Sequence, residues 1–267
     1  MQIILNLTLP FFAVVGLGYL AVKLGMLADD AVRSINVFVF NFAMPALVIG
    51  ALARQDFDTL VDVPFLIGWL IAGLALYVIG GVLCWLFFKG DIREIALTGQ
   101  AASVANVGFL GFPLLAAAFN KGAIGIAATA LLVDLMVLIP LSITMIEAHG
   151  GGSTAKIVRR VVKGAVFNPF LLAILTGFLI SASNLDMPAP AERLLQFLAS
   201  AAGPTALFAL GISLAARRVE GDTAAISTIV ILKLVGHPLA AYAALSALGV
   251  SEDTILIAMV IAALPVA

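Results

Sequence analysis

The stretch SVANVGFLGFPLL, residues 103–115, lies inside an apolar run that is long enough to cross a membrane. It combines one side-chain amide, Asn106, with Gly108, Gly111 and Pro113, which are poor helix formers. Backbone polar groups at membrane depth must find partners within the protein, so helix breakers at that depth are costly. Pro113 removes one intrahelical donor and frees an upstream carbonyl, which predicts two half-helices whose ends are exposed at the break.

The predicted break is suited to binding an anion. The half-helix that resumes after it presents N–H groups and the positive end of its dipole, and the Asn106 amide can donate to a carboxylate. Asn106, Val107, Gly108 and Pro113 are therefore candidate substrate-binding residues. The segment equally permits a second interpretation, in which Pro113 only kinks the helix, the glycines allow close packing and Asn106 bonds to a neighbouring helix.

Composition places the chain among membrane proteins. Of its 267 residues, 63% are apolar and 11% are charged, and the mean hydropathy is +1.19. The single cysteine, Cys84, excludes an intramolecular disulfide and a Cys-pair metal site. The sequence has no metalloprotease, serine-hydrolase or phosphate-loop motif, so we expect no enzyme activity, no cofactor and no metal, and the charge pattern does not suggest nucleic-acid binding.

Apolar runs predict an all-α fold, because a spanning helix needs about 20 mostly apolar residues. The predicted helices cover residues 3–22, 35–53, 63–88, 95–119, 123–146, 165–182, 194–215 and 224–248, and a ninth begins near Thr254. The ninth run stops at Ala267 after 14 residues, about 21 Å of helix in a hydrocarbon core about 30 Å thick. We therefore expect the chain to be truncated within helix 9, with the rest of that helix and a helix 10 missing.

Lys and Arg residues are distributed unequally between the two sets of loops. Ten of the 14 follow helices 1, 3, 5 and 7, and three lie on the opposite side. This asymmetry predicts a multi-pass membrane protein with its amino terminus outside. The loop from Glu147 to Lys163, which contains HGGGST, is then predicted to be a flexible cytoplasmic linker. The ten are Lys23, Arg33, Lys89, Arg93, Lys156, Arg159, Arg160, Lys163, Arg217 and Arg218, and the three are Arg54, Lys121 and Arg193.

The two halves of the chain share a pattern of prolines. NFAMPALVIGALA surrounds Pro45 and SAAGPTALFALGISLAA surrounds Pro204, while Pro113 is echoed by Pro265 in IAALPVA. Five helices per unit is an odd number, so the second copy must be inverted, and inverted repeats with interrupted spans are typical of secondary transporters. The predicted domains are a first repeat at 1–146, a linker at 147–164 and an incomplete second repeat at 165–267. Chance alignment of prolines, which are common in membrane helices, is the alternative.

Three ionisable residues lie within predicted spans, where a charge is a functional hypothesis by default. Lys233 and His237 are four residues apart and so share a helix face. Asp134 is the first candidate partner of Lys233, in a structural ion pair. Alternatively, Lys233 supplies the positive charge that a bound cation supplies in a cation-coupled carrier. His237 fits either a satisfied interior histidine or a proton relay.

Several segments, taken in order, resemble the auxin efflux carrier family, which includes plant PIN proteins and bacterial malate or malonate permease-like members. These segments are SINVFVFNFAMPALV, ANVGFLGFPLL, FNPFLLAILTGF, LFALGISLA, KLVGHPLAA and IAALP. The resemblance implies a ten-helix 5+5 inverted repeat, similar to bile-acid transporters and antiporters. It assigns helices 1, 2, 6 and 7 to a scaffold and helices 3–5 and 8–10 to a mobile transport domain. It also implies that Asn106 and Pro113 lie on one substrate-binding crossover and Pro265 on a second.

The sequence therefore predicts a secondary transporter of a small organic anion, a mono- or dicarboxylate, that works by elevator-type alternating access. One alternative is a cation-coupled carrier of a bulkier amphipathic anion, and another is a membrane receptor that binds without translocating. The resemblance and small residues around Gly16, Gly18 and Ala43 suggest a homodimer formed through scaffold helices.

Overall fold

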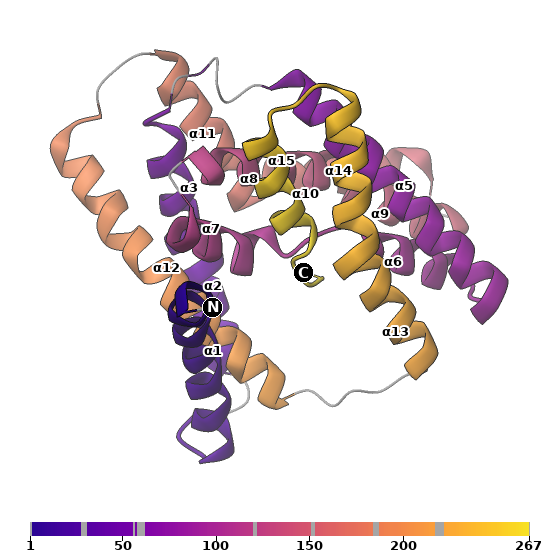
Figure 1. The fold of residues 1–267 in the computed structure, drawn as a ribbon, viewed down its shortest axis with the longest axis horizontal. Coiled ribbons are helices and arrows are strands. Elements are labelled where there is room, and N and C mark those ends of the chain that lie inside the picture. The colour runs from indigo at the N-terminus through magenta and orange to yellow at the C-terminus, as the bar shows by residue number, and fades with distance from the viewer. Residues whose placement is uncertain are drawn as a thin grey trace. The chain divides into compact units, whose positions relative to one another are not determined.

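The computed structural model describes residues 2–27, 31–55, 57, 62–119, 122–150, 153–183, 187–216 and 222–266. Within these ranges every regular element is helical (Figure 1). Six helical segments there are long and apolar enough to span a membrane: Ala31–Leu52, Val63–Phe88, Ile92–Ala118, Gly122–His149, Ala189–Ala215 and Thr223–Ala247. The predicted all-α membrane fold is confirmed, while the inverted repeat stays a prediction. Of the charged loop residues, Lys121, Arg217 and Arg218 lie outside the described ranges.

The chain forms two compact units. Unit 1 comprises Met1–Asp56, Gly108–Gly125 and Ala173–Glu220, and unit 2 comprises Phe57–Val107, Ile126–Leu172 and Gly221–Ala267. The predicted transport group contained the whole of helix 4, whereas the second half of that helix clusters with unit 1.

Close backbone contact joins two long helices of unit 1. α1 (Gln2–Lys23) packs along α12 (Ala189–Ala216), and the two lie side by side in Figure 1. A Cβ added to Gly18 would lie 2.1 Å from the Phe208 carbonyl oxygen, and one added to Gly211 would lie 2.0 Å from the Val15 carbonyl oxygen. Only glycine allows this approach. Gly18 is thus already used within the chain, which corrects the expectation that it forms a dimer face.

The second predicted span of unit 1 is one continuous helical rod. It consists of α2 (Ala31–Phe38), η1 (Val39–Ala43) and α3 (Met44–Leu52), and it packs on α12. Ala43 is fully buried there, so it too is unavailable to a partner subunit, whereas an added Cβ on Gly16 would meet nothing within 4 Å.

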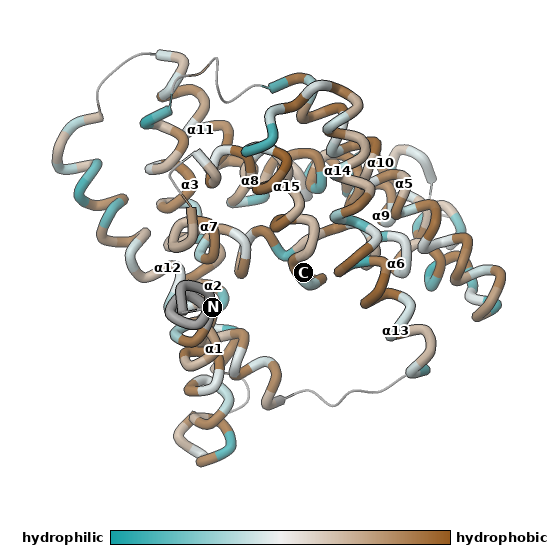
Figure 2. Tube along the Cα trace, in the orientation of Figure 1, coloured by the Kyte–Doolittle hydropathy of each residue, from teal (hydrophilic) through white to brown (hydrophobic). Residues whose placement is uncertain are grey.

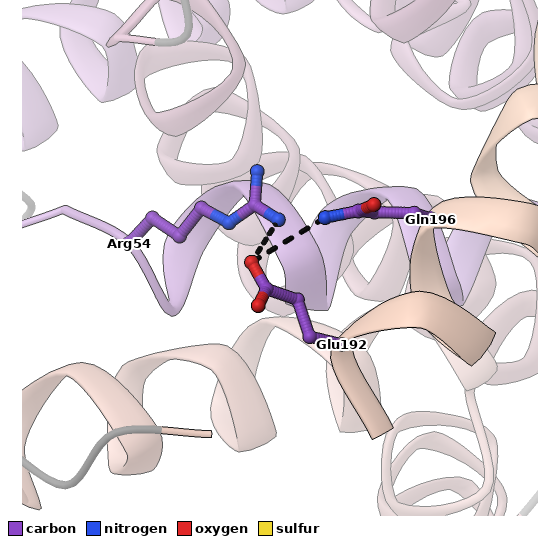
Figure 3. A network of polar contacts seen from close by, with 3 residues as sticks. All are labelled: Arg54, Glu192 and Gln196. Atoms are coloured by element: carbon purple, nitrogen blue, oxygen red, sulfur yellow. Dashed lines mark hydrogen bonds and ion pairs between the residues drawn. The ribbon is translucent and has the colours of Figure 1, made fainter. Parts of the chain in front are cut away.

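A polar cluster marks one end of this packing. Arg54 donates to Glu192 at 2.5 Å, and Gln196 donates to the same carboxylate oxygen at 3.4 Å (Figure 3). Both charged side chains are about one-third to two-fifths exposed, so the pair adds little free energy of folding.

Unit 2 is built around one long apolar helix, α5 (Val63–Phe88), which is hydrophobic along most of its length (Figure 2). It packs on α6 (Ile92–Ser103) and on α14 (His237–Ala247). Glycines let the helices approach closely, since a Cβ on Gly99 would lie 2.7 Å from the Tyr77 carbonyl oxygen. Aspartate caps fix where the first two helices begin. Asp62 accepts from the Phe65 N–H, and Asp91 forms a capping box with Glu94.

The rest of unit 2 comprises further helical elements. They are α8 (Gly122–Val133), η3 (Asp134–Leu138), α9 (Ile139–His149), α10 (Thr154–Val166), α13 (Thr223–Ile231), η4 (Leu232–Gly236) and α15 (Glu252–Ala262). The boundary between the units falls inside two helices. Residues 122–125 of α8 cluster with unit 1 and its remaining residues with unit 2. In α11 (Pro169–Ser183), residues 169–172 cluster with unit 2 and the remaining residues with unit 1.

α10 corrects one prediction. The expected flexible linker at 147–164 is wrong over most of its length, because α9 continues to His149 and α10 begins at Thr154. The three glycines of HGGGST suggested flexibility, but the residues after them have a helical pattern. Ile157 is buried while Val158 and Val162 are exposed, and α10 meets α11 at 57°.

Four π-helical segments occur in the described residues, and each precedes a proline. η1, η2 (Val107–Gly111), η3 and η4 lead into Pro45, Pro113, Pro140 and Pro238. Proline cannot donate and its ring clashes with the carbonyl four residues earlier, which one wider turn avoids. In three of the segments the next N–H bonds the carbonyl five residues back, from Met44 to Val39, Ile139 to Asp134 and His237 to Leu232.

Candidate functional site

Helix 4 is interrupted shortly before the glycines and the proline that predict a break. α6 ends at Ser103, Val104 is extended with φ −85° and ψ 128°, and regular helix resumes at Val107. The unwound residues precede the glycines and Pro113, which lie in η2 and α7 (Phe112–Ala118). The non-helical residues therefore lie before the π turn of η2 and not at Pro113 itself. This wider turn explains the shift, because it accommodates the proline within a helical segment.

The end of α15 meets this interruption within unit 2. α15 ends at Ala262, and the chain then turns through Ala263 and Leu264 to Pro265. The carbonyl of Pro265 accepts a 2.9 Å hydrogen bond from the Asn106 N–H. The break in helix 4 and the segment after α15 are therefore in direct contact at Asn106 and Pro265, while their roles as substrate-binding crossovers stay predictions.

The predicted substrate-binding residues differ in their surroundings. Asn106 is half-buried, Val107 is fully buried and Pro265 is exposed. Gly108 and Pro113 are buried but belong to unit 1, where Pro113 packs near Gly203. The structure thus brings Asn106, Val107 and Pro265 together in one unit.

Lys233 is buried next to the first break. Its side chain is 1% exposed, and its Nζ donates to the Ser103 carbonyl at 3.2 Å. Ser103 is the last residue of α6, so the ammonium satisfies a carbonyl that has no partner within the helix and lies at the negative end of the helix dipole. A lone ammonium at bilayer depth costs at least about 2.5–3.5 kcal/mol on insertion scales, so such partners are needed.

His237 is the second partner of Lys233. The Nζ and Nδ1 atoms are 2.8 Å apart, in agreement with the predicted shared face. The imidazole is fully buried, and its ring centroid lies 5.1 Å from that of Trp69. Nε2 makes no hydrogen bond of normal geometry. The backbone of Ala262, at the end of α15, interacts with the imidazole.

Asp134 faces the same cluster from η3. Its Oδ1 accepts from the Trp69 indole N–H at 3.2 Å, while Oδ2 makes no hydrogen bond of normal geometry. The backbone N–H of Ala105 lies near this carboxyl group. Asp134 and Lys233 interact electrostatically, but no direct ion pair joins them, and the hydrogen bonds of Lys233 go to other groups.

Sequence reasoning missed two members of this cluster. Trp69 carried a usable signal, because a tryptophan in the middle of a span needs a partner for its N–H. Ser103 carried none, since it contributes a backbone carbonyl that any residue would have. In the part of the chain that the structure describes, no group of three or more His, Cys, Asp or Glu side chains could hold a metal ion.

Comparison with known proteins identifies the family. The sequence matches the family model described as "Membrane transport protein" over residues 3–267. The chain belongs to this family. This confirms the predicted membership among auxin efflux carriers, and the transporter is a multi-pass membrane protein.

Three relatives show how far the likeness extends. The transporter is 30% identical to the "Putative malonate transporter" of Rhizobium meliloti (strain 1021), over 99% of this chain and 83% of that protein. It is 25% identical to the "Uncharacterized transporter YfdV" of Escherichia coli (strain K12), over 87% of this chain and 75% of that protein. An "Uncharacterized transporter" of Methanothermobacter thermautotrophicus is 28% identical over the same shares.

Proposed function

We propose that the protein is a secondary transporter of a small organic anion, a mono- or dicarboxylate. The observation that carries this proposal is the contact between the interruption of helix 4 and the segment after α15, where the Asn106 N–H bonds the Pro265 carbonyl. Interrupted spans that meet at membrane depth are the recurring form of substrate sites in secondary transporters. The name of the relative at 30% identity makes malonate the first anion to test.

The site favours an anion because donors gather at the first break. Asn106 carries a side-chain amide, a donor type that suits a carboxylate, and the helix that resumes at Val107 begins there with the positive end of its dipole. Lys233, which belongs to η4 and whose Nζ reaches the last carbonyl of α6, brings a basic group to the same region of unit 2. Charge-assisted hydrogen bonds of this kind are stronger than neutral ones.

An elevator-type mechanism fits the organisation of the chain. Two compact units, each with its own buried core, are what rigid-body movement of one unit against another requires. We further propose a homodimer in the bacterial inner membrane with the amino terminus outside. Gly16, which has open space around it, is the remaining small-residue candidate for a dimer contact in α1. Mass measurement in nanodiscs distinguishes a dimer from a monomer.

The transport proposal is tested by uptake of labelled malonate into proteoliposomes, with exchange against internal malonate as the readout. Asn106→Ala should reduce saturable exchange by about 10–150-fold, the loss expected for a hydrogen bond to a charged group. Asn41→Ala is the matched control. Asn41 is another span amide, but it is exposed and bonds its own helix at the Val37 carbonyl. Its exchange should stay at the wild-type rate.

Three outcomes separate the candidate functions. Saturable exchange that Asn106→Ala lowers and Asn41→Ala does not supports the carrier. Malonate binding without exchange favours a receptor. Exchange that survives unchanged in a folded Asn106→Ala protein would contradict the proposed site.

A further inference from the structure

α10 combines a strongly basic face with an apolar one. Its 13 residues, TAKIVRRVVKGAV, contain four Lys or Arg side chains and no acidic one. Four cations are too many for a segment in the hydrocarbon core of a bilayer, so α10 does not complete a span together with α11, from which it is bent by 57°. A helix with separate basic and apolar faces is typical of the membrane interface.

α10 packs on the protein along one side. Ile157 is buried, and Val161 and Ala165, which follow it at intervals of four on the same side of the helix, are half-buried. Arg160 donates to Glu147 of α9, the helix on which α10 packs. These contacts fix the rotation of α10 about its own axis, so they also fix which side chains point away from unit 2.

An apolar stripe runs along the exposed side of α10, next to the packed side. Val158, Val162 and Val166 recur every fourth residue and are 54%, 52% and 52% exposed. Phe167, at the corner between α10 and α11, is 70% exposed. A helix at a water-exposed surface carries polar side chains on its outer face, so this stripe indicates contact with an apolar medium.

Basic side chains border the stripe on its other edge. Lys156, Arg159 and Lys163 are exposed, and they form no ion pair with any residue that the structure describes. Arg159 and Lys163 directly follow Val158 and Val162 in the sequence, about 100° further round the helix. This order places unpaired cations at the level of lipid phosphates when the valines contact acyl chains.

We propose that α10 is an interfacial helix that binds anionic phospholipids, with the valine stripe against acyl chains and Lys156, Arg159 and Lys163 at the headgroup phosphates. Charge complementarity favours this occupant over a second copy of the chain, because two α10 helices would bring like charges together. The orientation predicted from the loops puts α10 at the cytoplasmic leaflet, whose anionic lipids attract basic segments. The proposal does not rest on the proposed transport of carboxylates, since its tests need no substrate.

The depth of α10 can be measured with a bimane fluorophore on a single cysteine of the full chain in lipid bilayers. Cys84→Ala removes the native thiol, and Val162→Cys and Gly164→Cys then place the label two residues apart, about 200° round the helix. Gly164 has open space around it, which makes it the matched control. Brominated phosphatidylcholine should quench the label at Val162, and acrylamide in the water should quench the label at Gly164. Equal quenching at the two positions, or a label at Val162 that only acrylamide reaches, would overturn the interfacial position.

Recognition of the anionic headgroup has a test of its own. With the label at Val162, brominated phosphatidylglycerol should quench at a lower mole fraction than brominated phosphatidylcholine in otherwise equal bilayers. Arg159→Gln with Lys163→Gln should reduce this preference by up to about fivefold per charge, the factor that one Lys or Arg contributes near an anionic surface. Lys23→Gln with Arg33→Gln, which removes two exposed charges from the same predicted side, should leave the preference unchanged. Equal quenching by the two lipids, or an equal loss in both double variants, would overturn the proposal.

Discussion

Replacing Trp69 with Phe removes one hydrogen bond from the buried cluster while keeping an aromatic ring in place. Trp69 is fully buried, and its ring stacks on Phe65 with centroids 6.0 Å apart, a contact that Phe can retain. The change takes the indole N–H away from Asp134, whose other oxygen already has no hydrogen bond of normal geometry. The carboxyl group would then be left with two poorly satisfied oxygens.

The expected loss of stability follows from these contacts. Leaving a buried acceptor without its donor costs about 1–3 kcal/mol. The smaller phenyl ring also leaves part of the indole volume empty, which adds about 1 kcal/mol. We therefore expect Trp69→Phe to lower the free energy of unfolding by about 2–4 kcal/mol, equivalent to about 4–16 °C in Tm for a chain of this size.

The protein contains its own reporter and its own control for this measurement. Cys84 is the single cysteine and is 5% exposed, so a thiol-reactive fluorophore reports unfolding in detergent. The second tryptophan, Trp85, is 61% exposed, and Trp85→Phe should change stability by no more than about 0.5 kcal/mol. If both variants melt within about 1 °C of each other, the Trp69–Asp134 bond contributes nothing to folding and the reasoning fails.

Three further outcomes are expected in the same melting assay. Gly18→Val should sharply lower Tm because its Cβ would lie 2.1 Å from a carbonyl of α12, while Gly16→Val, with open space, should not; equal effects would contradict the close crossing. The pKa of Asp91 is lowered, mainly by the hydrogen bond from the Glu94 N–H, so the Asp91 cap stabilises α6 above pH ~4 and this stabilisation is lost as the pH falls further. Asp91→Asn should retain the cap and abolish the acid-dependent part of the loss in Tm. Glu192→Gln breaks the partly exposed ion pair with Arg54 and should lower the free energy of unfolding by no more than about 1 kcal/mol. A larger loss would contradict the small contribution expected of this pair.

The features that could be predicted from the sequence are those with a local cause. Gly108, Gly111 and Pro113 predict an interruption in helix 4, and one is present just before them, at residues 104–106. Lys233 and His237 are four residues apart, which is close to one turn of an α-helix, so the spacing predicts that they share a face. Their Nζ and Nδ1 atoms are in contact, as predicted.

The features that could not be predicted depend on distant partners. From the sequence, a carboxylate is the expected partner of Lys233, yet its Nζ bonds the backbone carbonyl of a residue 130 positions away. Every residue has such a carbonyl, so the sequence does not indicate which one is used. The sequence suggests a dimer contact at Gly18 because small residues occur both between subunits and between helices of one chain. Only the position of α12 shows that Gly18 serves packing within the chain. The roles of the candidate site residues in transport stay predictions.

The bond from the Asn106 N–H to the Pro265 carbonyl has a consequence for mutational scans. It joins two main-chain groups, so a library of alanine substitutions leaves it intact at every position. A scan would therefore rank side chains around the junction and miss the main-chain link between the segments that follow α6 and α15. Asn106→Pro deletes the donor itself and so removes this link. Comparing it with Asn106→Ala separates the contribution of the peptide N–H from that of the Asn106 side chain.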